Sequence, residues 1–262
     1  MTAYAKGAPS AKGGESNEWF EIIRTVIYAL LIALILRVLL FQPFTIPSAS
    51  MEPNLFEGDY VVITKYDYGY SRHSFPISLP ESIFSGRLLA REPRRGDVVV
   101  FKLPRDTSGR TDYIKRLIGL PGDRIQVKQG VVYVNDEPIA RKPMPPGVED
   151  MGDGVIRPVR RYQETMPNGM TYLTNSYGDD GEADNTQVYR VPEGEYFMMG
   201  DNRDNSLDSR FPTEVGVGFV PAENLEGPAR MVLLSWYPGA SIFKPWTWVM
   251  NLRPSRFFHS LR

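Results

Sequence analysis

A long apolar segment near the N-terminus constrains this chain of 262 residues more than any other feature. It covers residues 19–44 and is interrupted by two arginines. A membrane-spanning helix needs about 20 mostly apolar residues, and arginines close to its ends can reach the interface. The segment therefore predicts one transmembrane helix over residues 19–41. A polar tail over residues 1–18 precedes it, and we expect this tail to be disordered.

The basic residues around the segment predict its orientation. Lys6, Lys12 and Arg24 lie toward its N-terminal side, whereas no Lys or Arg occurs between Arg37 and Lys65. Basic residues favour the cytoplasmic side of a membrane. The N-terminus is therefore expected in the cytoplasm, and the bulk of the chain on the other side.

Two other interpretations of the segment stay open. In the first, it belongs to a signal peptide that is cleaved at Ser48-Ala49-Ser50. Arg37 and residues 41–47 place that site unusually far from the apolar residues. In the second, the segment is an amphipathic helix buried in a protein core.

Composition excludes several classes of function. The chain has no cysteine, so it has no disulfide, no thiolate metal site and no cysteine nucleophile. Its two histidines, His73 and His259, stand apart from the other candidate catalytic residues, which argues against a histidine base and a histidine metal site. The net charge of −1 gives no indication of a nucleic-acid partner. We expect no metal and no cofactor.

Beyond the apolar segment, the pattern predicts a mainly β fold. Short β-branched and aromatic runs stand beside Gly-Asp pairs, as at residues 98–101. The runs at 124–127 and 131–134 flank a Lys-Gln-Gly turn and predict a hairpin. Together they indicate an antiparallel β domain over residues 42–137 and 191–262.

Three further regions break this pattern. Residues 66–95 predict a long loop. Residues 138–190 are rich in Pro, Gly, Asp and Asn, with only short strand candidates such as 170–173, so they predict a smaller, β-containing inserted lobe. A cluster near the C-terminus is expected to close the core, with the membrane interface as the alternative. Its members are Trp236, Phe243, Trp246, Trp248, Val249 and Met250.

A proline-bracketed run, Ile46-Pro47-Ser48-Ala49-Ser50-Met51-Glu52-Pro53, follows the apolar segment. Each proline fixes its own φ angle and favours extended geometry in the residue before it. Ser50 is therefore expected in a stiff, non-helical segment just outside the membrane. A serine held in this way is either a turn residue or a nucleophile.

Lys115 is the candidate base. In a strand it shares one face with Tyr113 and Leu117, while Ile114 and Arg116 point to the other face. If this face is buried, desolvation lowers the pKa of the lysine. A base at neutral pH requires such a shift, because a free lysine has a pKa of ~10.4. Taken alone, however, a lysine in a strand is usually exposed.

A dense polar run covers residues 200–210. Its spacing partly matches a calcium loop, but Leu207 replaces the loop glycine and Thr213 the late glutamate, which argues against calcium. Asp208 and Arg210 can pair and brace the run, which leaves Ser206 free to orient another group. A separate Ser-x-x-Lys match at 241–244 lacks the other elements of penicillin-binding proteins, so we attribute it to chance.

Three segments together resemble the bacterial type I signal peptidases: Pro-Ser-Ala-Ser-Met-Glu-Pro at 47–53, Tyr-Ile-Lys-Arg-Leu-Ile-Gly-Leu-Pro-Gly-Asp at 113–123, and Gly-Asp-Asn-Arg-Asp-Asn-Ser-Leu-Asp-Ser-Arg at 200–210. They follow an N-terminal anchor in the order of that family. The resemblance implies a serine endopeptidase with a Ser-Lys dyad, in which Ser50 is the nucleophile and Lys115 the general base. It also implies that Ser48 and the Ser50 N–H form the oxyanion hole, and that Ser206 orients the lysine.

The resemblance implies the biological setting as well. The substrates would be exported preproteins whose signal peptides are cut after small residues of the Ala-x-Ala type. The enzyme would be a single-pass protein of the bacterial inner membrane, with a periplasmic catalytic domain and membrane lipid among its partners, and we expect a monomer. Apolar pocket positions are Phe44, Ile46 and Ile114, and supporting positions are Tyr113, Arg116, Asp208 and Arg210.

The chain departs from the family pattern in three ways. Asn54 stands where a threonine is common, one span replaces the two of some members, and the cysteine pair of some members is missing. Two alternative functions remain: a membrane-anchored β domain that binds without catalysis, and another Ser-Lys hydrolase such as a self-cleaving repressor-type protease. The first gives no reason for Ser50, Lys115 and Ser206 to occur together. The membrane segment directly before Ser50 argues against the second.

Overall fold

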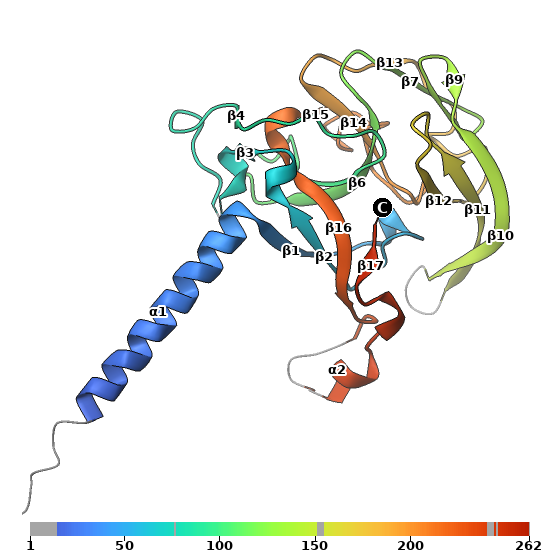
Figure 1. Cartoon of the computed structure of the whole chain (residues 1–262). Coiled ribbons are helices and arrows are strands. Elements are labelled where there is room, and N and C mark those ends of the chain that lie inside the picture. Colours follow the sequence, from blue (N-terminus) through green and yellow to red (C-terminus); the bar gives the residue numbers. More distant parts are fainter. Residues whose placement is uncertain (1–14, 76, 151–154, 240–243, 245, 262) are drawn as a thin grey trace, which may run out of the picture.

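The structure is a computed structural model that describes residues 15–75, 77–150, 155–239, 244 and 246–261. A long helix, α1 (Glu15–Leu39), projects from a body made mainly of strands (Figure 1). Its 22-residue apolar part, Glu18–Leu39, is exposed along its length, which argues against a buried core helix. A helix of this size is about 33 Å long and matches a hydrocarbon layer of about 30 Å.

The observed helix differs from the predicted one at both ends. It begins at Glu15, inside the tail that we expected to be disordered, and residues 1–14 lie outside the described residues. It ends at Leu39, before the predicted end at residue 41. The reason is that Phe41 already belongs to the first strand.

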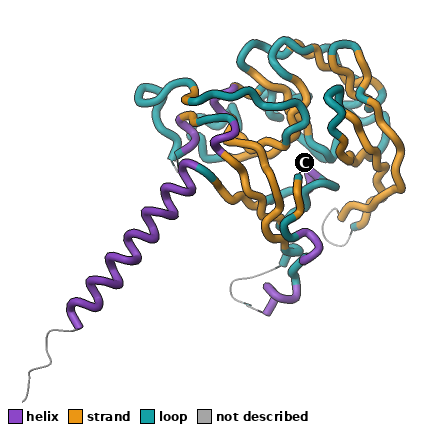
Figure 2. Tube along the Cα trace, in the orientation of Figure 1, coloured by secondary structure: helices purple, strands orange, loops and turns teal. Residues whose placement is uncertain are grey.

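The body is built on an eight-stranded antiparallel sheet, which confirms the predicted mainly β class (Figure 2). The strand order is β1 (Phe41–Thr45), β2 (Asp59–Thr64), β16 (Leu225–Ser235), β5 (Val98–Lys102), β6 (Asp112–Gly119), β14 (Glu195–Met199) and β15 (Val220–Pro221), and β17 (His259–Ser260) pairs with β16. All five residues of β5 are buried, as expected for a strand that is covered on both faces. This sheet places β1 at one edge and β6 deep inside.

A four-stranded sheet contains the predicted hairpin. Its order is β13 (Tyr189–Arg190), β7 (Arg124–Lys128), β8 (Val131–Val134) and β9 (Glu137–Pro138). Gln129 and Gly130 join β7 to β8, and both have positive φ angles of 49° and 71°. Two-residue hairpin turns often require this geometry. The hairpin is therefore confirmed.

The predicted inserted lobe holds longer strands than the sequence suggested. β10 (Ala140–Asp150), β11 (Ile156–Thr165) and β12 (Thr171–Ser176) form a three-stranded sheet in that order. Three prolines obscured β10, but an edge strand tolerates proline, and the register shifts where two of them occur, between Met144 and Gly147. Met166 and Tyr172 pack in one core with Ile125 and Phe197 of the body, so the lobe is not packed independently.

The remaining described elements are short. Among its described residues, the long loop holds the pair β3 (Tyr70–Ser71) and β4 (Arg87–Leu88) and two 3-10 turns, Lys65–Asp67 at its start and Arg72–Ser74. The other described 3-10 turns are Ala49–Met51, Ala222–Asn224 and Pro254–Arg256.

The C-terminal aromatic cluster does not close the core, so that expectation is wrong. A short helix, α2 (Trp246–Met250), carries most of it. Trp246 is 62% exposed, Trp248 47% and Met250 77%. Trp236 is half-buried, and Phe243 lies outside the described residues. The core is instead formed largely by residues of the central strands, such as Val99, Phe101 and Leu117.

Candidate active site

Ser50 lies in a single 3-10 turn, Ala49–Met51, directly after the extended residue Ser48. The expected non-helical geometry is therefore wrong for Ser50 itself. Glu52 is extended, as its position before Pro53 requires. Ser50 is only 9% exposed, and its hydroxyl lines a cavity.

Hydrogen bonds hold this turn on two sides. The Ile46 N–H donates to the Asp59 carbonyl at 2.8 Å, and the Gly58 N–H donates to the Ile46 carbonyl at 2.9 Å. On the other side, the Asn202 N–H donates to the Ser50 carbonyl at 3.1 Å. Sequence reasoning missed Asn202, because one amide in a polar run carries no sign of a partner far away in the chain.

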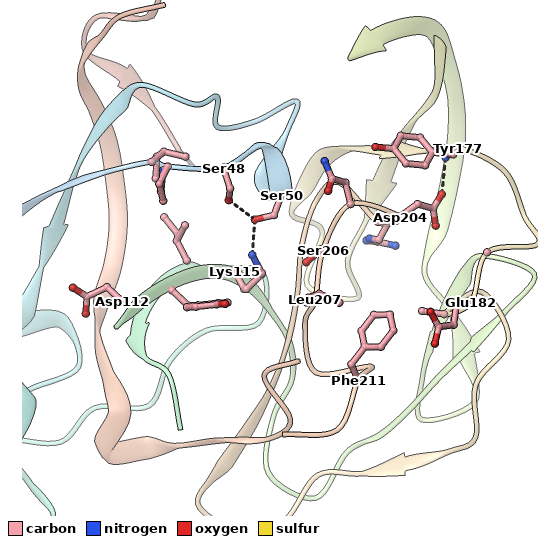
Figure 3. Close-up of a pocket in the computed structure, with 18 of the residues that line it drawn as sticks. Ser48, Ser50, Asp112, Lys115, Tyr177, Glu182, Asp204, Ser206, Leu207 and Phe211 are labelled. Atoms are coloured by element: carbon pink, nitrogen blue, oxygen red, sulfur yellow. Dashed lines mark hydrogen bonds between the residues drawn. The ribbon is translucent and has the colours of Figure 1, made fainter. Parts of the chain in front are cut away.

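Lys115 approaches Ser50 from β6. Its Nζ lies 2.5 Å from Ser50 Oγ in a buried hydrogen bond (Figure 3). The lysine is 4% exposed, so the strand face that carries it is buried, as the candidate base requires. The Tyr113 ring lies on the same side, with its centroid 5.6 Å from Nζ. The structure thus brings together two residues that the sequence separates widely.

Burial lowers the pKa of the Lys115 amine from 10.5 to about 8, because the charged form loses its hydration. The charges of Asp208 and Asp201 act in the opposite direction. Both carboxylates are instead paired with arginines: Asp201 accepts from Arg116 at 2.7 Å, and Asp208 accepts from Arg210 at 2.8 Å. The amine therefore has an appreciable neutral fraction near physiological pH.

The polar run is braced as the sequence predicted. The Asp208–Arg210 ion pair is buried, and Asp208 also accepts from the Gly200 N–H at 2.9 Å. Gly200 leaves room for a close approach: a Cβ there would lie 2.3 Å from Ser206 Oγ and 2.6 Å from the Ser50 carbonyl oxygen. Glycine at this position allows the run to pack directly against the turn Ala49–Met51, which we call the serine turn.

The two other candidate serines lie at the same cavity. Ser48 Oγ is 3.3 Å from Ser50 Oγ (Figure 3). Ser206 Oγ is buried and has no hydrogen-bond partner among the described residues. The oxyanion role of Ser48 and the lysine-orienting role of Ser206 therefore stay predictions.

A cavity of about 900 Å³ extends from Ser50 and Lys115. Its first wall contains the predicted pocket residues Phe44, Ile46 and Ile114. The opposite wall comes from the lobe and the polar run, with Tyr177, Glu182, Leu207 and Phe211 (Figure 3). Sequence reasoning missed this wall, because only the fold brings it to face β1. Within the described residues, no cluster of His, Asp and Glu could hold a metal ion.

The chain is similar to known proteins over most of its length. Residues 19–236, which include the whole site, match the family described as Signal peptidase, peptidase S26. A Signal peptidase I of Rickettsia typhi is 43% identical, over 89% of this chain and 90% of the relative. One of Rickettsia massiliae is 41% identical, over 94% and 92%. A crystal structure of a signal peptidase I from Enterococcus faecalis is 27% identical and covers 53% of this chain and 97% of that chain, with a TM-score of 0.30.

We predict that the amine of Lys115 titrates near pH 8, whereas exposed lysines titrate near their ordinary pKa of ~10.4. NMR of protein labelled with carbon-13 at lysine Cε measures this directly. In Asp208→Asn the pKa of Lys115 should fall further, because a negative charge that favours the ammonium form is removed. A pKa of Lys115 close to that of the exposed lysines would contradict the structure.

Proposed function

The chain belongs to the signal peptidase family, peptidase S26, as a serine peptidase that removes signal peptides, and we propose that Ser50 is its nucleophile and Lys115 its general base. The observation that carries this proposal is the buried contact of 2.5 Å between Ser50 Oγ and Lys115 Nζ. The lowered pKa of Lys115 supports it, because only the neutral amine can accept a proton.

The proposed reaction has two stages. Neutral Lys115 takes the hydroxyl proton as Ser50 Oγ attacks the carbonyl carbon of the scissile peptide bond. The resulting ammonium then protonates the departing amine, which leaves the signal peptide esterified to Ser50. In the second stage Lys115 deprotonates a water molecule, whose attack on the ester releases the signal peptide and returns the proton to Ser50.

Ser48 and Ser206 complete the proposed site. The Ser48 hydroxyl and the Ser50 N–H would donate to the oxyanion that forms in each stage. The first residues of a short helical turn have no carbonyl within the turn to accept from their N–H groups, which supports this role for Ser50. The buried, unpartnered Ser206 hydroxyl would hydrogen-bond to Lys115 and orient it.

We propose that the first wall of the cavity selects small residues before the cut. Ile46 and Ile114 are 2% and 8% exposed, so these apolar side chains are packed into the body and form a fixed part of this wall. Apolar walls reject such side chains sterically and need no charged partner. This supports cleavage after Ala-x-Ala-type sequences.

The exposed apolar helix fits a single-pass membrane protein. We propose that the N-terminus is cytoplasmic and the catalytic body periplasmic, at the inner membrane, because the basic residues gather before the span. Protease added outside sealed spheroplasts should then degrade the body, and full protection would contradict this orientation. A monomer suffices, since one chain supplies both members of the dyad.

Removal of either dyad residue should abolish cleavage of a preprotein with an Ala-x-Ala site. We expect Ser50→Ala and Lys115→Ala to lower kcat by at least about 10³-fold, as for catalytic residues that act as a unit. The assay uses the full chain in detergent and separates the cleaved product on a gel. Lys128→Ala is the matched control, because that strand lysine is exposed and should leave kcat unchanged. Unimpaired cleavage by Lys115→Ala would rule out the proposed base.

Gly200→Ala should also impair cleavage. The added Cβ must displace Ser206 or the Ser50 turn, and we expect kcat to fall about 10-fold or more, as for small misplacements of catalytic groups. Gly86→Ala is the control, since a Cβ there meets no atom within 4 Å. Gly86 also has a positive φ angle, so alanine at this position lowers the stability of the fold without touching the site. Equal kcat in both variants would show that the close packing has no catalytic value.

We propose that the exposed residues of α2 contact lipid, because tryptophans favour the membrane interface. In a Trp19→Phe background, brominated lipids in reconstituted vesicles should quench part of the fluorescence. Further replacement of Trp246 and Trp248 by Phe should remove most of that quenching. If quenching is unchanged, the two tryptophans do not reach lipid.

A further inference from the structure

Glu149 is a buried acidic residue on β10 of the inserted lobe, and it is only 1% exposed. It forms no ion pair with a described residue. Its carboxylate instead accepts three hydrogen bonds: Oε1 from Asn202 Nδ2 at 2.8 Å and Asn205 Nδ2 at 2.7 Å, and Oε2 from the Tyr177 hydroxyl at 3.0 Å. Hydrogen bonds to a carboxylate are shorter and stronger than neutral ones. Glu149 therefore fixes the groups that it contacts.

One of these groups holds the nucleophile. Asn202 is fully buried, and its Nδ2 donates both to Glu149 and to the Ala49 carbonyl, the latter at 3.1 Å. Its backbone N–H donates to the Ser50 carbonyl at 3.1 Å. A side-chain amide has two N–H donors on one nitrogen. Here one donor faces the lobe and the other faces the serine turn.

The chemistry of these partners allows only one orientation of the Asn202 amide. Glu149 Oε1 and the Ala49 carbonyl oxygen are both acceptors, so a flipped amide would place its own oxygen against them. With Glu149 absent, that constraint would rest on the Ala49 carbonyl alone. The carboxylate thus determines how Asn202 supports the turn.

A second contact of Glu149 acts at the other end of the same loop. Asn205 lines the cavity and directly precedes Ser206. By accepting from Asn202 and Asn205 together, one carboxylate oxygen spans the loop between the serine turn and the proposed lysine-orienting serine. No other described residue accepts from both of these amides.

We propose that Glu149 is a positioning residue, which acts through Asn202 to fix Ser50 relative to Lys115. The inserted lobe thereby sets the rate of the chemical step as well as forming a wall of the cavity. This inference rests on the proposed function of Ser50 and Lys115.

The test compares kcat and KM of Glu149→Ala, Glu149→Gln, Asn202→Ala and the double variant Glu149→Ala/Asn202→Ala, using the full chain in detergent and an Ala-x-Ala preprotein. Glu149→Ala should lower kcat about 10-fold or more and leave KM within about threefold, because the turn shifts while the pocket wall remains. Glu149→Gln should recover most of kcat, since its carbonyl can accept from both asparagines and its amide can donate to the Tyr177 oxygen. The double variant should be no slower than Asn202→Ala alone.

Asp179→Asn is the control, because this carboxylate lies on the same lobe but, among the described residues, forms ion pairs only with Arg141 and Arg160 near the surface. Its kcat and KM should equal those of the wild type. Melting curves of all variants separate a loss of folding from a loss of rate. If Glu149→Ala does not fold, Glu149→Asp, which withdraws the carboxylate by one methylene, is judged by the same criteria.

Three results would overturn the inference: a wild-type kcat in Glu149→Ala, a change in KM alone, or losses that multiply in the double variant. Failure of the proposed function is distinguishable, because Ser50→Ala or Lys115→Ala would then still cleave. If both dyad variants are inactive and Glu149→Ala is not impaired, only the inference about Glu149 is wrong.

Discussion

The buried amine of Lys115, 2.5 Å from Ser50 Oγ, is the contact on which the rest of the site depends. Burial makes the amine a base by penalising its charged form, but a carboxylate in direct contact would reverse that effect. The structure contains two buried carboxylates nearby and pairs each with an arginine: Asp201 with Arg116, and Asp208 with Arg210. Their charges act on Lys115 only from a distance. The arginines of the site thus keep the lysine from acquiring an anionic partner.

Buried ion pairs also join separate parts of the chain. Arg116 extends from β6 to the polar run, and Arg203 extends from the polar run to Glu164 on β11. A buried pair that loses one partner leaves an uncompensated charge, which is strongly destabilising. The strand that carries Lys115, the polar run and the lobe therefore adopt one relative arrangement. Glu149 extends this arrangement to the serine turn with neutral donors.

The sequence predicted those features whose cause is local. The hairpin at 124–134 follows from its turn residues, and the Asp208–Arg210 pair from spacing within one short run. Other features depend on distant contacts and gave no local signal. Asn202 and Glu149 are single polar residues, and their positions in the site depend on hydrogen-bond partners that only the fold brings close. The strand β10 was obscured by prolines that its edge position tolerates, and α2 was assigned to the core because aromatic residues have the same pattern whether they pack or meet lipid.

The path from α1 to Ser50 fixes the distance between the apolar helix and the candidate active site. The helix ends at Leu39 and β1 begins at Phe41, so no flexible linker separates the span from the sheet. The Tyr70 hydroxyl donates to the Leu39 carbonyl, and the Lys65 N–H donates to the Leu40 carbonyl, which fastens the end of the helix to the body. β1 then rises about 3.3 Å per residue toward the serine turn. The position of Ser50 relative to the apolar helix is therefore set by backbone geometry and two hydrogen bonds. A signal peptide in the same bilayer would meet Ser50, the proposed nucleophile, at a fixed distance from its own apolar segment.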